Sequence, residues 1–299
     1  MQKKDIKNYI VNYKLEKYES ILSKYNIYHF ESSLLDKNKK VIYSYKPEAT
    51  SKLFTEVFKK EGKDIYIYLQ KRFILDCILT SLDQYFSHLY TLSIQEEFIV
   101  FISRVLKFCE SEEGWSKYNE DVYWKDLGTA CQIIYPVHSG IVEIYSGLGV
   151  RQGLSKNIYH SLNYMNMLMK LRGRRPFYQI HTHTPQIDKF NENGWKKSYL
   201  QVSEMLRKHE NIKGVLRCSW FFDPCLKDIS PHLMYLQNLP LKHGAKRFYV
   251  GPDKSRNALY NSKKRKKMYE DGKYIPKLYL LVWPRKEIIK WVTTYSNAE

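Results

Sequence analysis

Long apolar runs, glycine, proline and paired cysteines are all scarce in this 299-residue sequence. No stretch approaches the roughly 18 consecutive apolar residues of a membrane-spanning helix, and the charged N-terminus leads into no apolar segment typical of a secretory signal. The 13 glycines and 10 prolines exclude a collagen-like or linker-like chain. The five cysteines include no CxxC pair, so no zinc knuckle is indicated, and we expect reduced thiols in a cytoplasmic protein.

Aromatic and apolar residues, in contrast, are plentiful. Hydrophobic residues make up 43% of the chain and aromatic residues 15%, with 26 tyrosines. Disordered chains are poor in these residue types, so the composition predicts a folded globular protein. At roughly 150 residues per domain, the length favours two domains.

Positive charge dominates and is concentrated in two segments. Lys and Arg number 49 against 31 Asp and Glu, which gives a formal net charge of +18. Residues 151–187 contain six basic residues and no acidic one, and residues 254–277 contain nine basic residues against two acidic ones. Such charge concentrates anions nearby, so we expect an anionic ligand, an acidic carrier protein or a nucleic acid as partner. For the lysine run at 263–267, a solvated helix face is the alternative.

Residues 1–126 are predicted to form a mostly helical N-terminal region. Apolar residues recur there at helical spacing, for example Phe98, Ile102 and Val105. The short apolar run at 65–69 also fits a strand that would interrupt the helices. The polar segment that follows residue 109 is interpreted as the domain boundary.

Residues 127–299 alternate short apolar runs with amphipathic segments, which predicts an α/β fold, or alternatively α+β, with a mixed central sheet flanked by helices. The expected elements are a hairpin within 131–145, helices at 154–171, 193–209 and 253–272, and strands at 177–183, 215–222, 247–250 and 278–283. Of these strands, 177–183 and 215–222 are predicted to be central neighbours. The helix at 154–171 carries a stripe that is interpreted as core, made of Ile158, Leu162, Met165 and Met169.

Two histidines, His181 and His183, are the most unusual local feature. Because side chains alternate along a strand, both are predicted to project from one face at its carboxyl end, where open α/β sheets place ligands. Imidazole titrates near neutral pH, so either ring suits a general base. Ser219 belongs to the neighbouring expected strand and Asp223 follows it, and both are predicted to lie within reach. Two structural histidines, held by hydrogen bonds, are the alternative.

The same pair also suits a divalent metal ion. A His-x-His pair supplies two ligands, and Asp188 is a candidate third, with Glu192, Asp223 and His232 as others. The string His-Thr-His-Thr at 181–184 resembles the opening motif of the PHP-type metallohydrolases, in which further ligand motifs follow. Here the later histidines lie in no second motif of that kind.

Standard nucleotide fingerprints are missing: the chain has neither GxGxxG nor GxxxxGK[ST]. A glycine-rich turn at 146–153 nevertheless lies between an expected strand and an expected helix, where free backbone N–H groups suit an anion. Gly149 and Gly153 flank Arg151 and Gln152 in this turn. The alternative is a plain strand-to-helix connection without a ligand.

The order strand, glycine-rich turn, helix, strand, helix, strand from residue 140 resembles the GNAT-type N-acyltransferases. In that family a turn of the form [QR]-x-x-G-x-[GA] opens a helix and binds the pyrophosphate of acyl-CoA. Here Arg151-Gln152-Gly153-Leu154-Ser155 occupies the matching place, with Arg151 one residue too close to Gly153 and serine where Gly or Ala is usual. The resemblance implies an acyl donor bound as a thioester to coenzyme A or to an acyl-carrier protein.

Three hypotheses follow. In the leading one, an acyltransferase, His181 or His183 takes a proton from the acceptor amine, and Arg174 and Arg175 help the glycine-rich turn to hold the donor. Trp220 and Phe222 would line an apolar slot in that site. The alternatives are a metal-dependent enzyme that uses the two histidines, and a non-enzymatic basic protein that binds nucleic acid.

Overall fold

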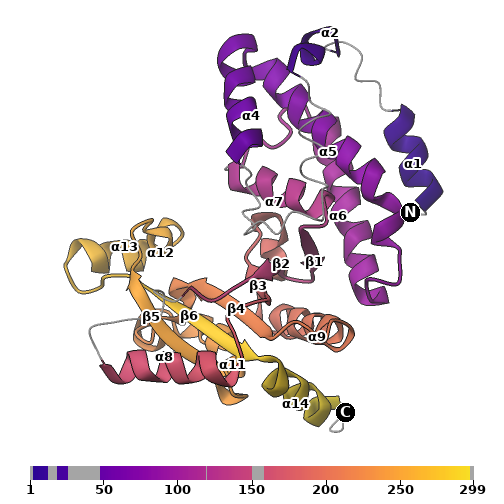
Figure 1. Ribbon diagram of the computed structural model, residues 1–299. Helices are drawn as coiled ribbons and strands as arrows, with labels where there is room; N and C mark the ends of the chain where they lie inside the picture. The colour runs from indigo at the N-terminus through magenta and orange to yellow at the C-terminus, as the bar shows by residue number, and fades with distance from the viewer. Residues whose placement is uncertain (1–2, 13–18, 26–47, 119, 150–157, 297–299) are drawn as a thin grey trace. The chain divides into compact units, whose positions relative to one another are not determined.

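The computed structural model describes residues 3–12, 19–25, 48–118, 120–149 and 158–296 (Figure 1). The chain divides into two compact units. Unit 1 comprises residues 1–143 and 182–189, and unit 2 comprises residues 144–181 and 190–299. The division therefore falls inside a strand, between Glu143 and Ile144, whereas the sequence pattern changes near residue 127.

Unit 1 is mainly helical, as expected from its apolar periodicity. Its described helices are α1 (Lys3–Asn12), α2 (Glu19–Leu22), η2 (Ser23–Tyr25), α4 (Glu48–Glu61), α5 (Lys63–Tyr85), α6 (Leu92–Glu110), α7 (Glu120–Ala130) and the short η4 (Thr184–Lys189). Aromatic rings form much of the core. Phe54 of α4 packs edge-to-face on Phe73 of α5, and its ring centroid lies 5.4 Å from that of Tyr123 of α7. In the described residues, no helix is both long and apolar enough to cross a membrane.

The strand expected at 65–69 is wrong, because these residues lie within α5. Both α4 and α7 pack against α5, so this helix is covered on more than one side. Ile67, Tyr68 and Leu69 are consecutive and all buried. A continuous apolar run therefore suits a helix here, because tertiary contacts override the local β preference.

The hairpin expected within 131–145 is confirmed. The strands β1 (Ile134–Val137) and β2 (Gly140–Ser146) pair antiparallel, and Val137 lies opposite Gly140. His138 and Ser139 form the two-residue connection, which is a common length for a hairpin loop.

The strands belong to one mixed sheet, as the α/β pattern predicted. The later strands are β3 (Phe177–His181), β4 (Gly214–Ser219), β5 (Lys246–Pro252) and β6 (Lys277–Pro284), and the strand order is β1-β2-β3-β4-β6-β5. The expected central neighbours β3 and β4 are confirmed as a parallel pair, in which Tyr178 lies opposite Val215. The pairs β4/β6 and β5/β6 are antiparallel.

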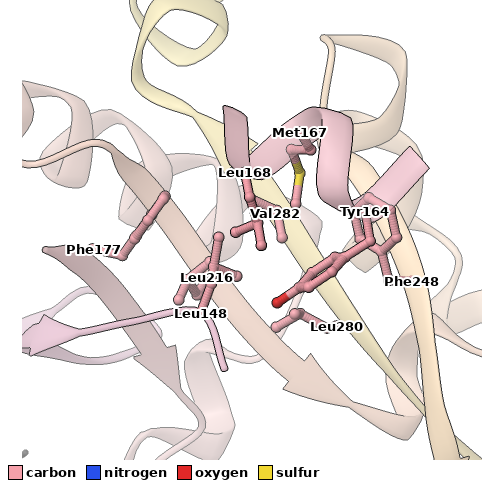
Figure 2. Close-up of a cluster of buried hydrophobic side chains, with 9 residues drawn as sticks. All are labelled: Leu148, Tyr164, Met167, Leu168, Phe177, Leu216, Phe248, Leu280 and Val282. Carbon is pink, nitrogen blue, oxygen red and sulfur yellow. The ribbon is translucent and has the colours of Figure 1, made fainter. Parts of the chain in front are cut away.

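The helix α8 (Ile158–Lys170) covers one face of the unit 2 sheet. Its buried side chains Tyr164, Met167 and Leu168 pack on the sheet (Figure 2). The sheet side of this cluster consists of Phe177, Leu216, Phe248, Leu280 and Val282, with Leu148 beside them. The structure thus corrects the core stripe expected on α8: Ile158, Leu162, Met165 and Met169 are exposed.

The helices α9 (Glu192–Lys208), α11 (Tyr235–Lys242) and α14 (Arg285–Ser296) belong to the opposite face. Tyr199 of α9 packs edge-to-face on Trp283 of β6, and Trp291 of α14 lies 5.4 Å from the same indole. Alternation along β4 explains the division, because Leu216 faces α8 and its neighbour Arg217 stacks under Trp195 of α9.

Two expected elements are shorter than predicted. The strand at 215–222 ends at Ser219, and η5 (Trp220–Phe222) continues as a single turn before α10 (Leu226–Ile229) and η6 (Pro231–Leu233). The basic helix expected at 253–272 is two short helices, α12 (Asn257–Tyr260) and α13 (Lys263–Glu270). Ser262 separates them by accepting a hydrogen bond from Arg265 N, as a helix N-cap does.

Candidate functional site

The two histidines of the sequence motif have different surroundings. β3 ends at His181, so strand alternation does not reach His183. His181 is half-buried at the carboxyl end of β3 in unit 2, whereas His183 is 4% exposed in unit 1. The common face that alternation predicted is therefore not formed by the strand.

His183 lies within a buried polar network of unit 1. Its Nε2 is 3.1 Å from Oδ1 of Asp126, and both side chains are about 1% exposed. Burial, reinforced by the positive charges of Arg104 and Lys125 and only partly opposed by Asp126, lowers the pKa of His183 to about 3. At neutral pH this ring is uncharged, and it accepts a proton far less readily than a base with a pKa near 7.

Ser219 and Asp223 are engaged by nearby backbone. Ser219 Oγ accepts a hydrogen bond from Phe221 N and so caps η5. Asp223 is fully buried, and its two oxygens accept hydrogen bonds from Cys225 N at 3.0 Å and Lys277 N at 3.3 Å. These contacts connect the end of β4 to the start of β6.

The expected apolar slot is occupied by protein. Trp220 belongs to a buried cluster with Leu226 and Ala258, and the Arg265 guanidinium lies 4.7 Å from its ring centroid. Phe222 is fully buried. Both aromatic residues thus pack against other side chains of unit 2.

The glycine-rich turn and the two arginines are brought together in part. Leu148 N donates a hydrogen bond to Arg174 O, and a Cβ atom at Gly147 would collide with the Arg175 side chain and with Arg174 O. Gly149 O accepts a hydrogen bond from Tyr164 of α8. Arg151, Gln152 and Gly153 lie outside the described residues, as does the rest of the turn that resembles the GNAT motif.

Arg174 and Arg175 lie at the amino end of β3, whereas His181 lies at its carboxyl end. An extended chain advances about 3.3 Å per residue, so the six residues from Arg175 to His181 span about 20 Å. The structure therefore does not gather the proposed donor-binding arginines and the proposed base into one compact site.

The metal alternative has no cluster to support it in the part of the chain that the structure describes. No group of three His, Cys, Asp or Glu side chains has an arrangement that could hold a metal ion there. Asp188, the candidate third ligand, lies in η4 of unit 1.

A large basic cleft lies in unit 2, at the end of the sheet where β4 begins and β6 ends. Its volume is about 1230 Å³, and its walls come from α8, the segment before β4, the start of β5 and the start of α14. The cationic residues of this cleft are Lys170, Lys213, Lys246, Arg247, Arg285 and Lys286. Glu210 and Glu287 are the two carboxylates that line it.

Several cations of the basic cleft contact neutral acceptors. Lys213 Nζ donates to Leu171 O at 2.9 Å and to Arg172 O at 3.1 Å, and Arg285 Nη1 donates to His209 O at 2.8 Å. Backbone carbonyls carry no net charge, so these contacts fix the side chains and leave their positive charge in place. The cleft is therefore suited to an anion.

The basic cleft also has apolar side chains and an imidazole. Met167, Leu171 and Phe248 line it, and the His160 ring packs edge-to-face on Phe248 with 5.5 Å between centroids. Sequence reasoning missed His160, although its position four residues before Tyr164 places it on the sheet-facing side of α8. The stripe that the sequence analysis interpreted as core lies on the exposed side of this helix.

The sequence and the fold were compared with known proteins. No family model matches the chain, no curated protein matches it, and no solved structure matches it.

Proposed function

We propose that unit 2 is an acyltransferase that holds an anionic thioester donor, either acyl-CoA or an acyl group on a carrier protein, in the basic cleft. The observation that supports this function is the combination of six cationic side chains with the apolar residues Met167, Leu171 and Phe248 in one cleft of about 1230 Å³. A donor with phosphate groups and an acyl chain has the same two chemical parts. The volume exceeds the 300–1,000 Å³ of most small-ligand sites, which suits a long cofactor.

The cleft supplies groups for the acceptor as well. Glu210 and Glu287 would attract a protonated amine, and His160 would remove a proton from the amine as general base. The amine nitrogen then forms a bond to the thioester carbonyl carbon, and the carbon–sulfur bond breaks. The proton held by His160 passes to the leaving thiolate, and the nitrogen releases its second proton to solvent, so the products are an amide, a free thiol and one proton.

Donor binding is tested by calorimetric titration of coenzyme A. A triple variant with Lys170→Gln, Lys246→Gln and Lys286→Gln removes three exposed charges from the cleft. The control variant, with Lys263→Gln, Lys264→Gln and Lys266→Gln, removes the same charge from α13. At about 0.5 kcal/mol for each exposed contact, the cleft variant should bind coenzyme A about tenfold more weakly, and the control should bind it normally.

Two results would contradict this assignment. Wild-type protein that fails to bind coenzyme A or an acyl-carrier protein at millimolar concentration removes the donor. Binding of single-stranded nucleic acid that depends steeply on salt and is lost only in the α13 variant would favour the nucleic-acid hypothesis instead.

Catalysis is tested by following thiol release from acetyl-CoA with a panel of amines. His160→Gln should lower kcat by about 10² to 10⁴ and leave coenzyme A affinity unchanged, as expected for loss of a general base. His181→Gln is the matched comparison, because His181 lies at the carboxyl end of β3 and is half-buried like His160. A loss of activity in His181→Gln alone would move the reaction to the carboxyl end of β3.

A further inference from the structure

A second cleft of unit 2 lies between α9, α11 and α14 and does not depend on the proposed function. Its volume is about 340 Å³. We call it the aromatic cleft, because its lining includes Trp195, Tyr199, Tyr235, Trp291 and Tyr295. This size is at the lower end of the range for small-ligand sites.

A buried arginine lies behind the aromatic cleft. Arg217, on β4, is 2% exposed, and its guanidinium carbon is 3.8 Å from the ring centroid of Trp195. Phe221 and Phe222 flank the same guanidinium at 5.6 and 5.4 Å. Trp195 and Tyr199, which are walls of the cleft, are thus also neighbours of this cation.

Among the described residues, the Arg217 guanidinium lacks the well-formed hydrogen bonds that a buried charge requires. In the described residues, neither Nη1 nor Nη2 has a hydrogen-bond acceptor in suitable geometry. Burial lowers the pKa of Arg217. The Tyr199 hydroxyl lies close enough to the guanidinium for a weak side-chain hydrogen bond that opposes this shift, but the contact does not have ordinary hydrogen-bond geometry. Trp195 Nε1, whose ring stacks on the guanidinium, likewise has no acceptor among the described residues.

Such an arrangement is costly for the protein on its own. Arginine stays protonated in proteins, and a buried cation without a carboxylate or an acceptor loses its hydration without compensation. Stacking on Trp195 recovers only part of that loss, because a cation–π contact is weaker than the hydration that the guanidinium gives up. A ligand that supplies two acceptor oxygens would satisfy the planar donor fork of the guanidinium.

The other charged groups of the cleft restrict the ligand further. Glu192 lines it and opposes a ligand with more than one negative charge. Lys196 lies with its Nζ 3.9 Å from the Tyr295 ring centroid and offsets part of that effect. The aromatic walls favour a flat apolar body.

We infer that the aromatic cleft binds a small organic monocarboxylate with a planar apolar group, whose carboxylate pairs with Arg217 and whose body lies between the walls of Trp195 and Tyr235. The Tyr199 hydroxyl donates to the same carboxylate. Arg217 is the specificity-determining residue of this site.

The test uses benzoate, 3-phenylpropionate and indole-3-acetate, with 3-phenylpropanamide as the neutral match and inorganic phosphate as the match without a ring. Binding is followed by indole fluorescence and by the shift in melting temperature of the full chain. At least one of the carboxylates should saturate and raise the melting temperature by several degrees at a concentration well above its Kd. The amide should bind at least tenfold more weakly, and phosphate should give no shift.

Three variants separate binding from structure. Arg217→Met should abolish carboxylate binding and leave the melting temperature of the free protein unchanged or higher, because an apolar side chain replaces an unsatisfied buried charge. Arg217→Lys keeps the charge without the planar fork and should bind at least tenfold more weakly. Arg207→Met removes an exposed arginine of α9 and should bind normally.

Two outcomes would overturn the inference. If none of the three carboxylates binds to wild-type protein at about 10 mM, a concentration at which even a weak ligand would bind, the cleft does not take this class of ligand. If Arg217→Met melts lower than wild type and both Arg217 variants bind the carboxylates as Arg207→Met does, the arginine is a structural residue only.

Discussion

Each unit of the molecule buries a charged side chain, and the two side chains differ in how well hydrogen bonds satisfy the charge. In unit 1, Asp126 is fully buried and accepts hydrogen bonds from both Nη atoms of Arg104, at 2.8 and 2.7 Å, and from Trp115 Nε1 at 2.7 Å. In unit 2, Arg217 is 2% exposed and stacks on aromatic rings, and within the described residues neither of its Nη atoms meets an acceptor in ordinary hydrogen-bond geometry. A satisfied buried charge holds a structure together, whereas an unsatisfied one indicates a place for a ligand.

The comparison has an energetic consequence. Removing one partner of a satisfied buried ion pair leaves the other charge without compensation and is strongly destabilising. Replacing an unsatisfied charge by an apolar side chain of similar volume removes a cost instead. Mutations at the two sites should therefore change stability in opposite directions.

The largest effect is expected at the satisfied charge. Asp126→Ala should lower the free energy of unfolding of unit 1 by about 3–5 kcal/mol, because Arg104 and Trp115 then lose their acceptor within the core. Urea unfolding, with hydrogen exchange of α7 to assign the effect to unit 1, measures it. Asp121→Ala is the control, since its side chain is 44% exposed and pairs with Lys125. A loss below 1 kcal/mol at Asp126 would end the contrast between the two units.

A second buried arginine of unit 2 sharpens the comparison. Arg265 is 6% exposed, but its Nε donates to Ala258 O and its Nη1 donates to Ser230 Oγ at 2.9 Å. Arg265→Gln should cost about 1–3 kcal/mol, because two buried acceptors lose their donor. Thermal unfolding compares it with Lys266→Gln, an exposed neighbour on α13. A loss of stability equal to that of the lysine control would mean that the hydrogen bonds of Arg265 do not stabilise the protein.

Arg265 also shows what the sequence could not reveal. The run Lys263-Lys264-Arg265-Lys266-Lys267 has one chemical character, so nothing local indicates that only its middle member is buried. The same limit applies to α8, where two sides of the helix carry apolar residues. The sheet covers the side with Tyr164 and Leu168, and the pattern alone favoured the side with Met165.

The α/β class, the hairpin and the adjacency of β3 and β4 could be predicted, because short-range periodicity and turn residues locate the strands and consecutive strands of an α/β chain are commonly neighbours. The clefts could not be predicted in this way. The aromatic cleft brings together Trp195, Tyr235 and Trp291, which lie on three helices that are far apart in the sequence. Arg217 becomes unusual only once its burial is known. In the sequence it is one basic residue in an apolar strand.

The pH dependence of stability tests a second member of the buried network around Asp126, the ring of His183. Burial lowers the pKa of this ring to about 3, below the value of 6.5 for an unperturbed histidine. Between these values the unfolded chain binds a proton that the folded ring does not, so stability falls as the pH falls from 6.5 toward 3. One such group contributes a slope of up to about 1.4 kcal/mol per pH unit.

The free energy of unfolding of His183→Gln should therefore change less with pH than that of wild type between about pH 4 and about pH 6.5, which is most of the interval between the two pKa values. Urea unfolding at a series of pH values measures the difference, in which the carboxylates common to both proteins cancel. His88→Gln, an exposed histidine of unit 1, should follow the wild-type curve. Parallel curves for wild type and His183→Gln would show that the ring is accessible to protons in the folded protein.

The smallest effect on stability is expected where charge is exposed and needs no partner. Replacing Lys263, Lys264, Lys266 and Lys267 by Gln should change the free energy of unfolding by less than about 0.5 kcal/mol per site, because all four are exposed on α13. Arg265 is retained, since its burial makes it unlike its neighbours. We expect weaker retention on an anionic matrix at low salt, measured by the elution salt concentration. Elution identical to wild type would mean that the lysines form only a solvated face, and a large loss of stability would show that exposure does not separate the lysines from Arg265.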